Sequence, residues 1–64
     1  MDEKIKQLHE NYRKSIDSFY ENETVNNKRK MNSCANELRK ECEINNLSFL
    51  KVCDELTNHI LKIN

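Results

Sequence analysis

The side chains in this 64-residue chain that could do chemistry are three cysteines and two histidines. Cys34, Cys42 and Cys53 have seven and then ten residues between them, whereas zinc sites use closely spaced pairs such as C-x2-C. An odd number of cysteines cannot form a complete disulfide framework. We therefore interpret all three as small buried hydrophobic side chains. A Cys42–Cys53 bridge, an intermolecular bridge and a thiolate nucleophile are the alternatives.

The two histidines do not form part of a metal-binding or catalytic pattern. His9 and His59 lie far apart in the sequence, and His59 lies too far around a helix from Cys53 for both to bind one metal. Phosphate-binding loops require glycine, and the chain has none. A thin helical chain also offers little concavity for an active site. We predict no catalytic residue, no metal, no cofactor and no enzymatic activity.

The charges balance, with eleven basic and eleven acidic residues. Proteins that bind nucleic acid usually carry a basic excess or stripe, so nucleic acid and an anionic membrane are disfavoured partners. The one basic cluster, Lys28-Arg29-Lys30, is interpreted as a solvated helix face, with phosphate contact as the alternative. No apolar run approaches the roughly 20 residues that span a bilayer, and the first ten residues lack the apolar core of a secretory signal. We expect a soluble, intracellular protein of the reducing cytoplasm.

The elements that must position these side chains follow from a chain without glycine or proline. Those residues supply most tight turns and helix breaks, so the sequence predicts an all-α fold of helices joined by very short links. Apolar residues recur at helical spacing in three stretches. We expect one domain over 1–64 with helices at about 2–20, 25–44 and 48–63.

Asparagine-rich segments mark the two links between these helices. The apolar stripe fails over 21–30, and a break at 22–24 with Asn22 or Thr24 as the next N-cap is preferred to one continuous helix over 2–44. Asn45-Asn46 is the strongest turn signal, because asparagine tolerates the left-handed conformation that ends helices. Ser48 is predicted to cap the third helix. We expect this short link to fold the second and third helices into a tight antiparallel hairpin.

A chain of this length closes only a marginal core, and only 36% of its residues are hydrophobic. We therefore expect oligomerisation or a partner protein to complete the fold, with the apolar stripes of the first and third helices forming the interface. The function expected is a small protein–protein interaction module: a regulator or inhibitor docking on a larger protein, or a helical subunit of an assembly. The alternative is a dimeric nucleic-acid-associated regulator that uses Lys28, Arg29 and Lys30. The predicted interface residues are Tyr12, Ile16, Phe19, Tyr20, Phe49, Leu50, Leu56, Ile60 and Leu61.

Overall fold

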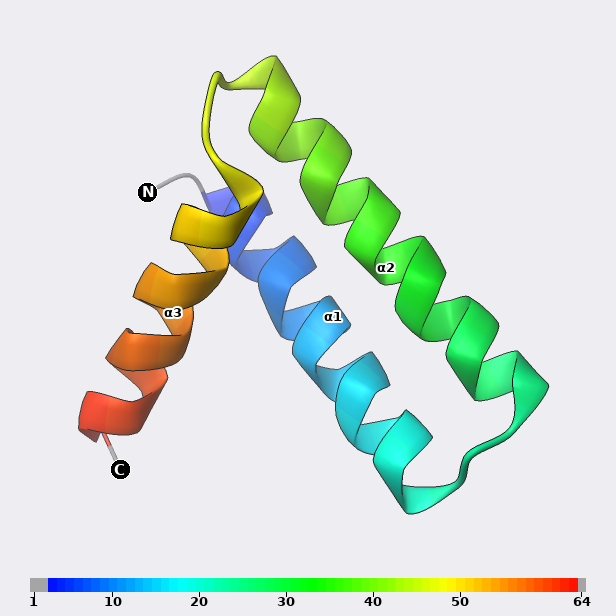
Figure 1. Ribbon diagram of the computed structural model, residues 1–64. Coiled ribbons are helices and arrows are strands. Elements are labelled where there is room, and N and C mark those ends of the chain that lie inside the picture. The colour runs from blue at the N-terminus through cyan, green and yellow to red at the C-terminus, as the bar shows by residue number, and fades with distance from the viewer. Residues whose placement is uncertain (1–2, 64) are drawn as a thin grey trace.

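Residues 3–63 form three α-helices, in the order α1 (Glu3–Glu21), α2 (Val25–Ile44) and α3 (Phe49–Ile63), as Figure 1 shows. The computed structural model describes the backbone of residues 3–63 and the side chains of residues 3–58. The described residues contain no strand, so the predicted all-α class is confirmed. The helix bounds agree with the predicted ones to within one residue. No helix in the described residues combines the length and apolarity needed to cross a bilayer.

The link between α1 and α2 is held by the side chains of Thr24 and Asn27. Thr24 has extended backbone angles, and its hydroxyl oxygen accepts a 3.1 Å hydrogen bond from the Asn27 amide. This is an N-cap, which satisfies one of the unpaired amides that begin a helix. The Asn27 side chain donates to the carbonyl oxygens of Asn22, at 2.8 Å, and Ser18, at 3.3 Å. The predicted break is therefore confirmed, and the continuous helix over 2–44 is not formed.

The link between α2 and α3 begins with a hydrogen-bonded reversal built on asparagine. Asn46 has φ 56°, the left-handed conformation, and its amide donates to the Glu43 carbonyl at 3.1 Å. The Leu47 amide donates to the Cys42 carbonyl at 2.8 Å. These two bonds form a Schellman motif, which stops a helix by pairing its last carbonyls. The turn predicted at Asn45-Asn46 is confirmed. At Ser48, the predicted cap, the side chain accepts from the Lys51 amide at a long 3.5 Å.

The antiparallel pair in this fold is α1 with α2, which lie side by side along their lengths (Figure 1). Ile5 of α1 and Leu38 and Cys42 of α2 are almost wholly buried between them. An ion pair between Lys4 and Glu41, with nitrogen and oxygen 3.4 Å apart, joins the two helices at the same end. The core therefore sits where α1 begins and α2 ends, which is also where α3 starts.

The expected hairpin of α2 with α3 differs from the structure. After the second link α3 runs off at a steep angle to both other helices (Figure 1), and it packs on the core through Phe49, Val52, Cys53 and Leu56. The short link did not impose an antiparallel course on α3. The Asn46 and Leu47 amides bond to carbonyls of α2, so these hydrogen bonds end α2 and leave the direction of α3 open. The direction of α3 is set instead by where its first apolar side chains find a core to pack on.

Candidate interaction surface

The cysteines are three free thiols, with Cys42 buried and Cys34 and Cys53 half-buried. Burial raises the pKa of the Cys42 thiol, and the nearby Glu41 carboxylate adds to the rise. Burial also raises the pKa of Cys53, with a further contribution from Cys42. Because the thiolate is the reactive form, both side chains stay protonated at neutral pH. Their structure matches the interpretation as small buried hydrophobic residues.

His9 is buried on α1, with 5% of its surface exposed. Burial lowers its pKa below the ordinary 6.5, and the neighbouring Arg13 charge lowers it further. His9 is therefore a neutral packing residue of α1. The side chain of His59 lies outside the described residues. Among the described residues, no three His, Cys, Asp or Glu side chains come together in a way that could hold a metal ion.

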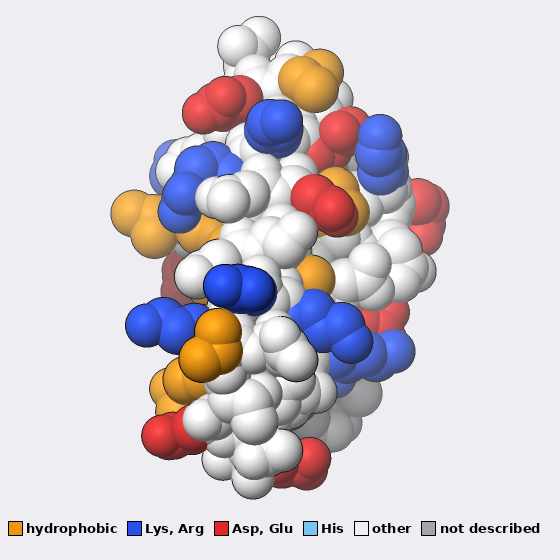
Figure 2. Space-filling view, turned by 90° about the vertical axis from the view of Figure 1, so that its right-hand side faces the viewer, with side chains coloured by type: hydrophobic (Ala, Val, Ile, Leu, Met, Phe, Trp, Pro, Cys, Tyr) orange, Lys and Arg blue, Asp and Glu red, His pale blue; other side chains and the backbone are white. Residues whose placement is uncertain are grey.

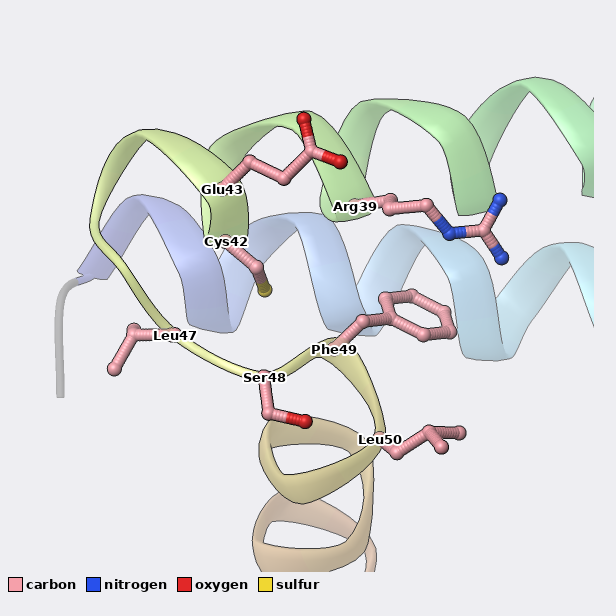
Figure 3. Close-up of a pocket in the computed structure, with 7 residues that line it drawn as sticks. All are labelled: Arg39, Cys42, Glu43, Leu47, Ser48, Phe49 and Leu50. Carbon is pink, nitrogen blue, oxygen red and sulfur yellow. The ribbon is translucent and has the colours of Figure 1, made fainter.

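A solvent-open hollow of about 420 Å3 lies at the corner where α2 ends and α3 begins. Figure 3 shows Arg39 and Glu43 of α2 along one side, and Leu47 and Leu50 at the two ends of the opposite side. The Cys42 sulfur points into the space between them. The hollow thus has an apolar floor and ends, with one positive and one negative side chain on its rim.

Phe49 forms the rest of the floor and is fixed by two contacts within the chain. Its ring centroid lies 6.1 Å from that of Tyr12 in a tilted arrangement. The Arg39 guanidinium carbon lies 4.9 Å from the same ring centroid, which is a cation–π contact. Phe49 therefore joins all three helices, and its contacts build the hollow rather than leave the ring exposed for a partner.

Large hydrophobic side chains are exposed at both ends of the helix pair. Near the first link, Tyr20 is 74% exposed and Val25 is 67% exposed. Near the second link, Leu50 is 77% exposed, Ile44 is 74% exposed and Leu47 is 42% exposed. Of these, Leu47 and Leu50 line the hollow described above. This end of the molecule therefore combines exposed apolar side chains with a concave surface.

The predicted interface residues fall into four groups in the structure. Tyr12, Phe49 and Leu56 pack against the chain's own core, and Ile16 and Phe19 are half-buried. Tyr20 and Leu50 are exposed in the single chain, so a partner could contact both. The side chains of Ile60 and Leu61 lie outside the described residues.

Sequence reasoning missed four residues of this end of the molecule: Ile44, Leu47, Arg39 and Glu43. A signal for the first two was present, because both are apolar residues that flank the Asn45-Asn46 turn. The spacing of Arg39 and Glu43 indicates only that they share a face of α2. That this face borders a hollow had no sequence signal, since it depends on the direction of α3.

The basic cluster Lys28, Arg29 and Lys30 is exposed on the first turns of α2. Lys30 also lines a second hollow, of about 240 Å3, with Lys14 and Ser18 of α1. Lys14 is already paired with Glu10, at 3.6 Å. On the face drawn in Figure 2, basic side chains are interspersed with acidic and uncharged ones.

Compared with models of known protein families, with curated proteins and with solved structures, this chain matches none.

Proposed function

We propose that this protein is a small non-enzymatic protein–protein interaction module, acting as a regulator or inhibitor on a larger protein or as a helical subunit of an assembly. The observation that carries the proposal is the exposed apolar surface at the second link, where Leu47 and Leu50 line one hollow and Ile44 lies at the same end. Single exposed hydrophobic residues are ordinary on protein surfaces. Hydrophobic side chains gathered about a concavity are typical of a docking site.

The course of α3 supports completion of the fold by another protein chain. Among the side chains that the structure describes, which end at residue 58, those from Phe49 to Leu56 bring α3 onto the core. The backbone of α3 then continues as a helix to Ile63, away from the α1–α2 pair (Figure 1). The sequence of this last part contains Ile60, Leu61 and Ile63. A partner that packs along α3 would bury such residues, which is the usual way an amphipathic helix is recognised.

A non-enzymatic role fits the chemistry of the hollow. Cys42 is the only nucleophilic thiol that lines it, and its raised pKa keeps the sulfur protonated. His9, which could serve as a base, is buried elsewhere on α1. Free thiols also fit the reducing cytoplasm, where we place this function.

The proposal is tested by attaching a tag to this protein and capturing it from nuclease-treated cell extract. Mass spectrometry then identifies the proteins that it retains. We expect a protein to be retained in stoichiometric amount, another copy of this chain included. Retention should be lost in a Leu47→Glu/Leu50→Glu double variant and kept in Val25→Glu, a matched change at the other end of α2. An extract that yields no stoichiometric protein with the wild type would contradict the proposal.

A nucleic-acid-associated regulator is the second candidate, favoured by one observation. Lys14 of α1 lies with Lys30 around a single hollow, which extends the basic cluster of Lys28 and Arg29 onto a second helix. Binding of duplex DNA should then weaken steeply with salt concentration. It should also fall when Lys28, Arg29 and Lys30 are all changed to Gln. Binding that ignores salt and this triple change would remove the second candidate.

A further inference from the structure

We propose that the hollow at the α2–α3 corner binds a second copy of this chain in a two-fold dimer. Leu50 of each copy enters the hollow of the other, and Arg39 of each copy pairs with Glu43 of the other. The inference rests on the proposed function and names the partner and the surface.

The first argument is that a protruding side chain and a hollow lie next to each other on one surface. Leu50, on the first turn of α3, is 77% exposed and stands at one end of the hollow (Figure 3). The volume of about 420 Å3 is many times the ~30 Å3 that one water molecule occupies in the liquid, so a leucine side chain has room to enter. In a two-fold interface the same patch is used on both subunits. A patch that carries both the protrusion and the hollow meets that requirement.

The second argument is the charge pattern on the rim. Arg39 and Glu43 lie one helical turn apart on α2 and both line the hollow, on the side that α2 forms (Figure 3). If two copies of α2 lie antiparallel across a two-fold axis between these positions, Arg39 faces Glu43 twice. The ion pairs described within residues 3–58 join other residues: Lys4 to Glu41, Lys6 to Glu3 and Lys14 to Glu10. The rim charges are thus available to a partner.

The stacking of Arg39 on Phe49 prepares the guanidinium for this pairing. A guanidinium that lies over an aromatic ring keeps the N–H groups at its edge available for a carboxylate. Because the contact with the ring, at 4.9 Å, already restricts the side chain, less conformational entropy is lost when a carboxylate binds.

The same charges favour a second copy over an unrelated partner of one charge sign. An acidic surface placed on this rim would repel Glu43, and a basic one would repel Arg39, whereas a second copy pairs both. The chain has no net charge at neutral pH, so two copies approach each other without long-range repulsion.

Sedimentation equilibrium over a wide range of protein concentration tests the dimer and its surface. We expect a monomer–dimer equilibrium for the wild type. Leu50→Glu should raise the dissociation constant of the dimer roughly 30-fold, the effect of removing an interface hot spot. Val25→Glu is the control, since Val25 is also an exposed hydrophobic residue of a helix first turn and should leave dissociation unchanged. Circular dichroism establishes that each variant is as helical as the wild type. Leu50→Ala is the substitute if Leu50→Glu fails to fold.

The charge pairing is tested by mixing two single variants. Arg39→Glu and Glu43→Arg should each dimerise more weakly than the wild type, because like charges then face each other across the axis. An equal mixture should form the heterodimer, observable by native mass spectrometry, because each Glu again faces an Arg. Failure of the mixture to dimerise better than the separate variants would overturn the pairing.

Two outcomes separate this inference from the proposed function. A wild type that is monomeric at every concentration, or a dimer unaffected by Leu50→Glu, would overturn the inference. The proposed function would still stand in either case if the captured protein is a different one. Absence of both self-association and any captured protein would overturn the two together.

Discussion

The two links of this chain are both rich in asparagine, yet they position the following helix in different ways. At the first link, the Asn27 side chain reaches back from α2 to the carbonyls of Ser18 and Asn22, so the bonds connect the end of α1 to the start of α2. At the second link, the Asn46 and Leu47 amides and the Asn45 side chain all bond to carbonyls of α2. The first arrangement couples two helices, whereas the second only ends one.

The consequence is visible in the packing of the two neighbours. α1 and α2 lie side by side along their lengths, whereas α3 diverges from both after the second link (Figure 1). Among the side chains described, to residue 58, α3 packs on the core through Phe49, Val52, Cys53 and Leu56. A helix attached by a few side chains leaves apolar surface around its attachment point, and here that surface contains Leu47 and Leu50. The divergence of α3 from the other two helices thus creates the candidate interaction surface.

The substitution expected to change the attachment of α3 most, relative to the packing of α1 on α2, is Phe49→Ala. It removes the ring that contacts Tyr12 and Arg39, and we expect a loss of about 3 kcal/mol in the free energy of unfolding, the lower end for a buried phenylalanine. Nuclear magnetic resonance should show the largest shifts in residues 49–58 and around Tyr12, with small ones at the first link. Equal changes in the signals of all three helices would contradict the separate attachment of α3.

Leu38→Ala is the matched core substitution for that experiment. Leu38 is completely buried, and removal of such a side chain costs about 2–5 kcal/mol. Because Leu38 lies in the core shared by the whole chain, its loss should destabilise the three helices together. The two variants therefore distinguish a local detachment from a general loss of stability.

Helix positions could be predicted from the sequence, because apolar spacing and asparagine capping are local properties. Thr24, Asn45 and Asn46 act as their residue types predicted. The arrangement of the helices could not be predicted, since each stripe could pack on either of the others. The sequence predicts Phe49 at an interface because it lies on the apolar stripe of the third helix. Only the folded chain brings Tyr12 and Arg39 to its ring.

A smaller effect is expected from changing the caps of the two links. Thr24→Ala removes the side-chain acceptor of the Asn27 amide and should lower the free energy of unfolding by about 1 kcal/mol. Asn46→Gly should cost nothing or stabilise slightly, because glycine adopts the left-handed conformation of Asn46 without steric cost. Denaturant titrations of both variants measure this difference. A larger cost for Asn46→Gly than for Thr24→Ala would mean that the Asn46 side chain does more than tolerate the turn.

The mildest perturbation is a change of pH, which acts on α1 through His9. The pKa of His9 in the folded protein lies below the ordinary 6.5, so the unfolded chain takes up a proton first as the pH falls. The contribution of neutral His9 to stability is complete above about pH 6.5 and decreases below it, until the folded-state pKa is passed. Unfolding free energies measured between pH 7.5 and 5 should show this slope. In His9→Gln the slope should become smaller, and an unchanged slope would assign it to other groups.

Residue-resolved amide hydrogen exchange, at a protein concentration where the monomer prevails, tests most directly whether α3 is the weakly attached helix. Amides in cooperative units of different stability exchange with different free energies of opening. We predict that amides of residues 53–58 in α3 open at a clearly lower free energy than those around Leu38 in α2 and those in the middle of α1. Equal opening free energies in all three helices would show that the chain folds as a single cooperative unit, which would contradict the account.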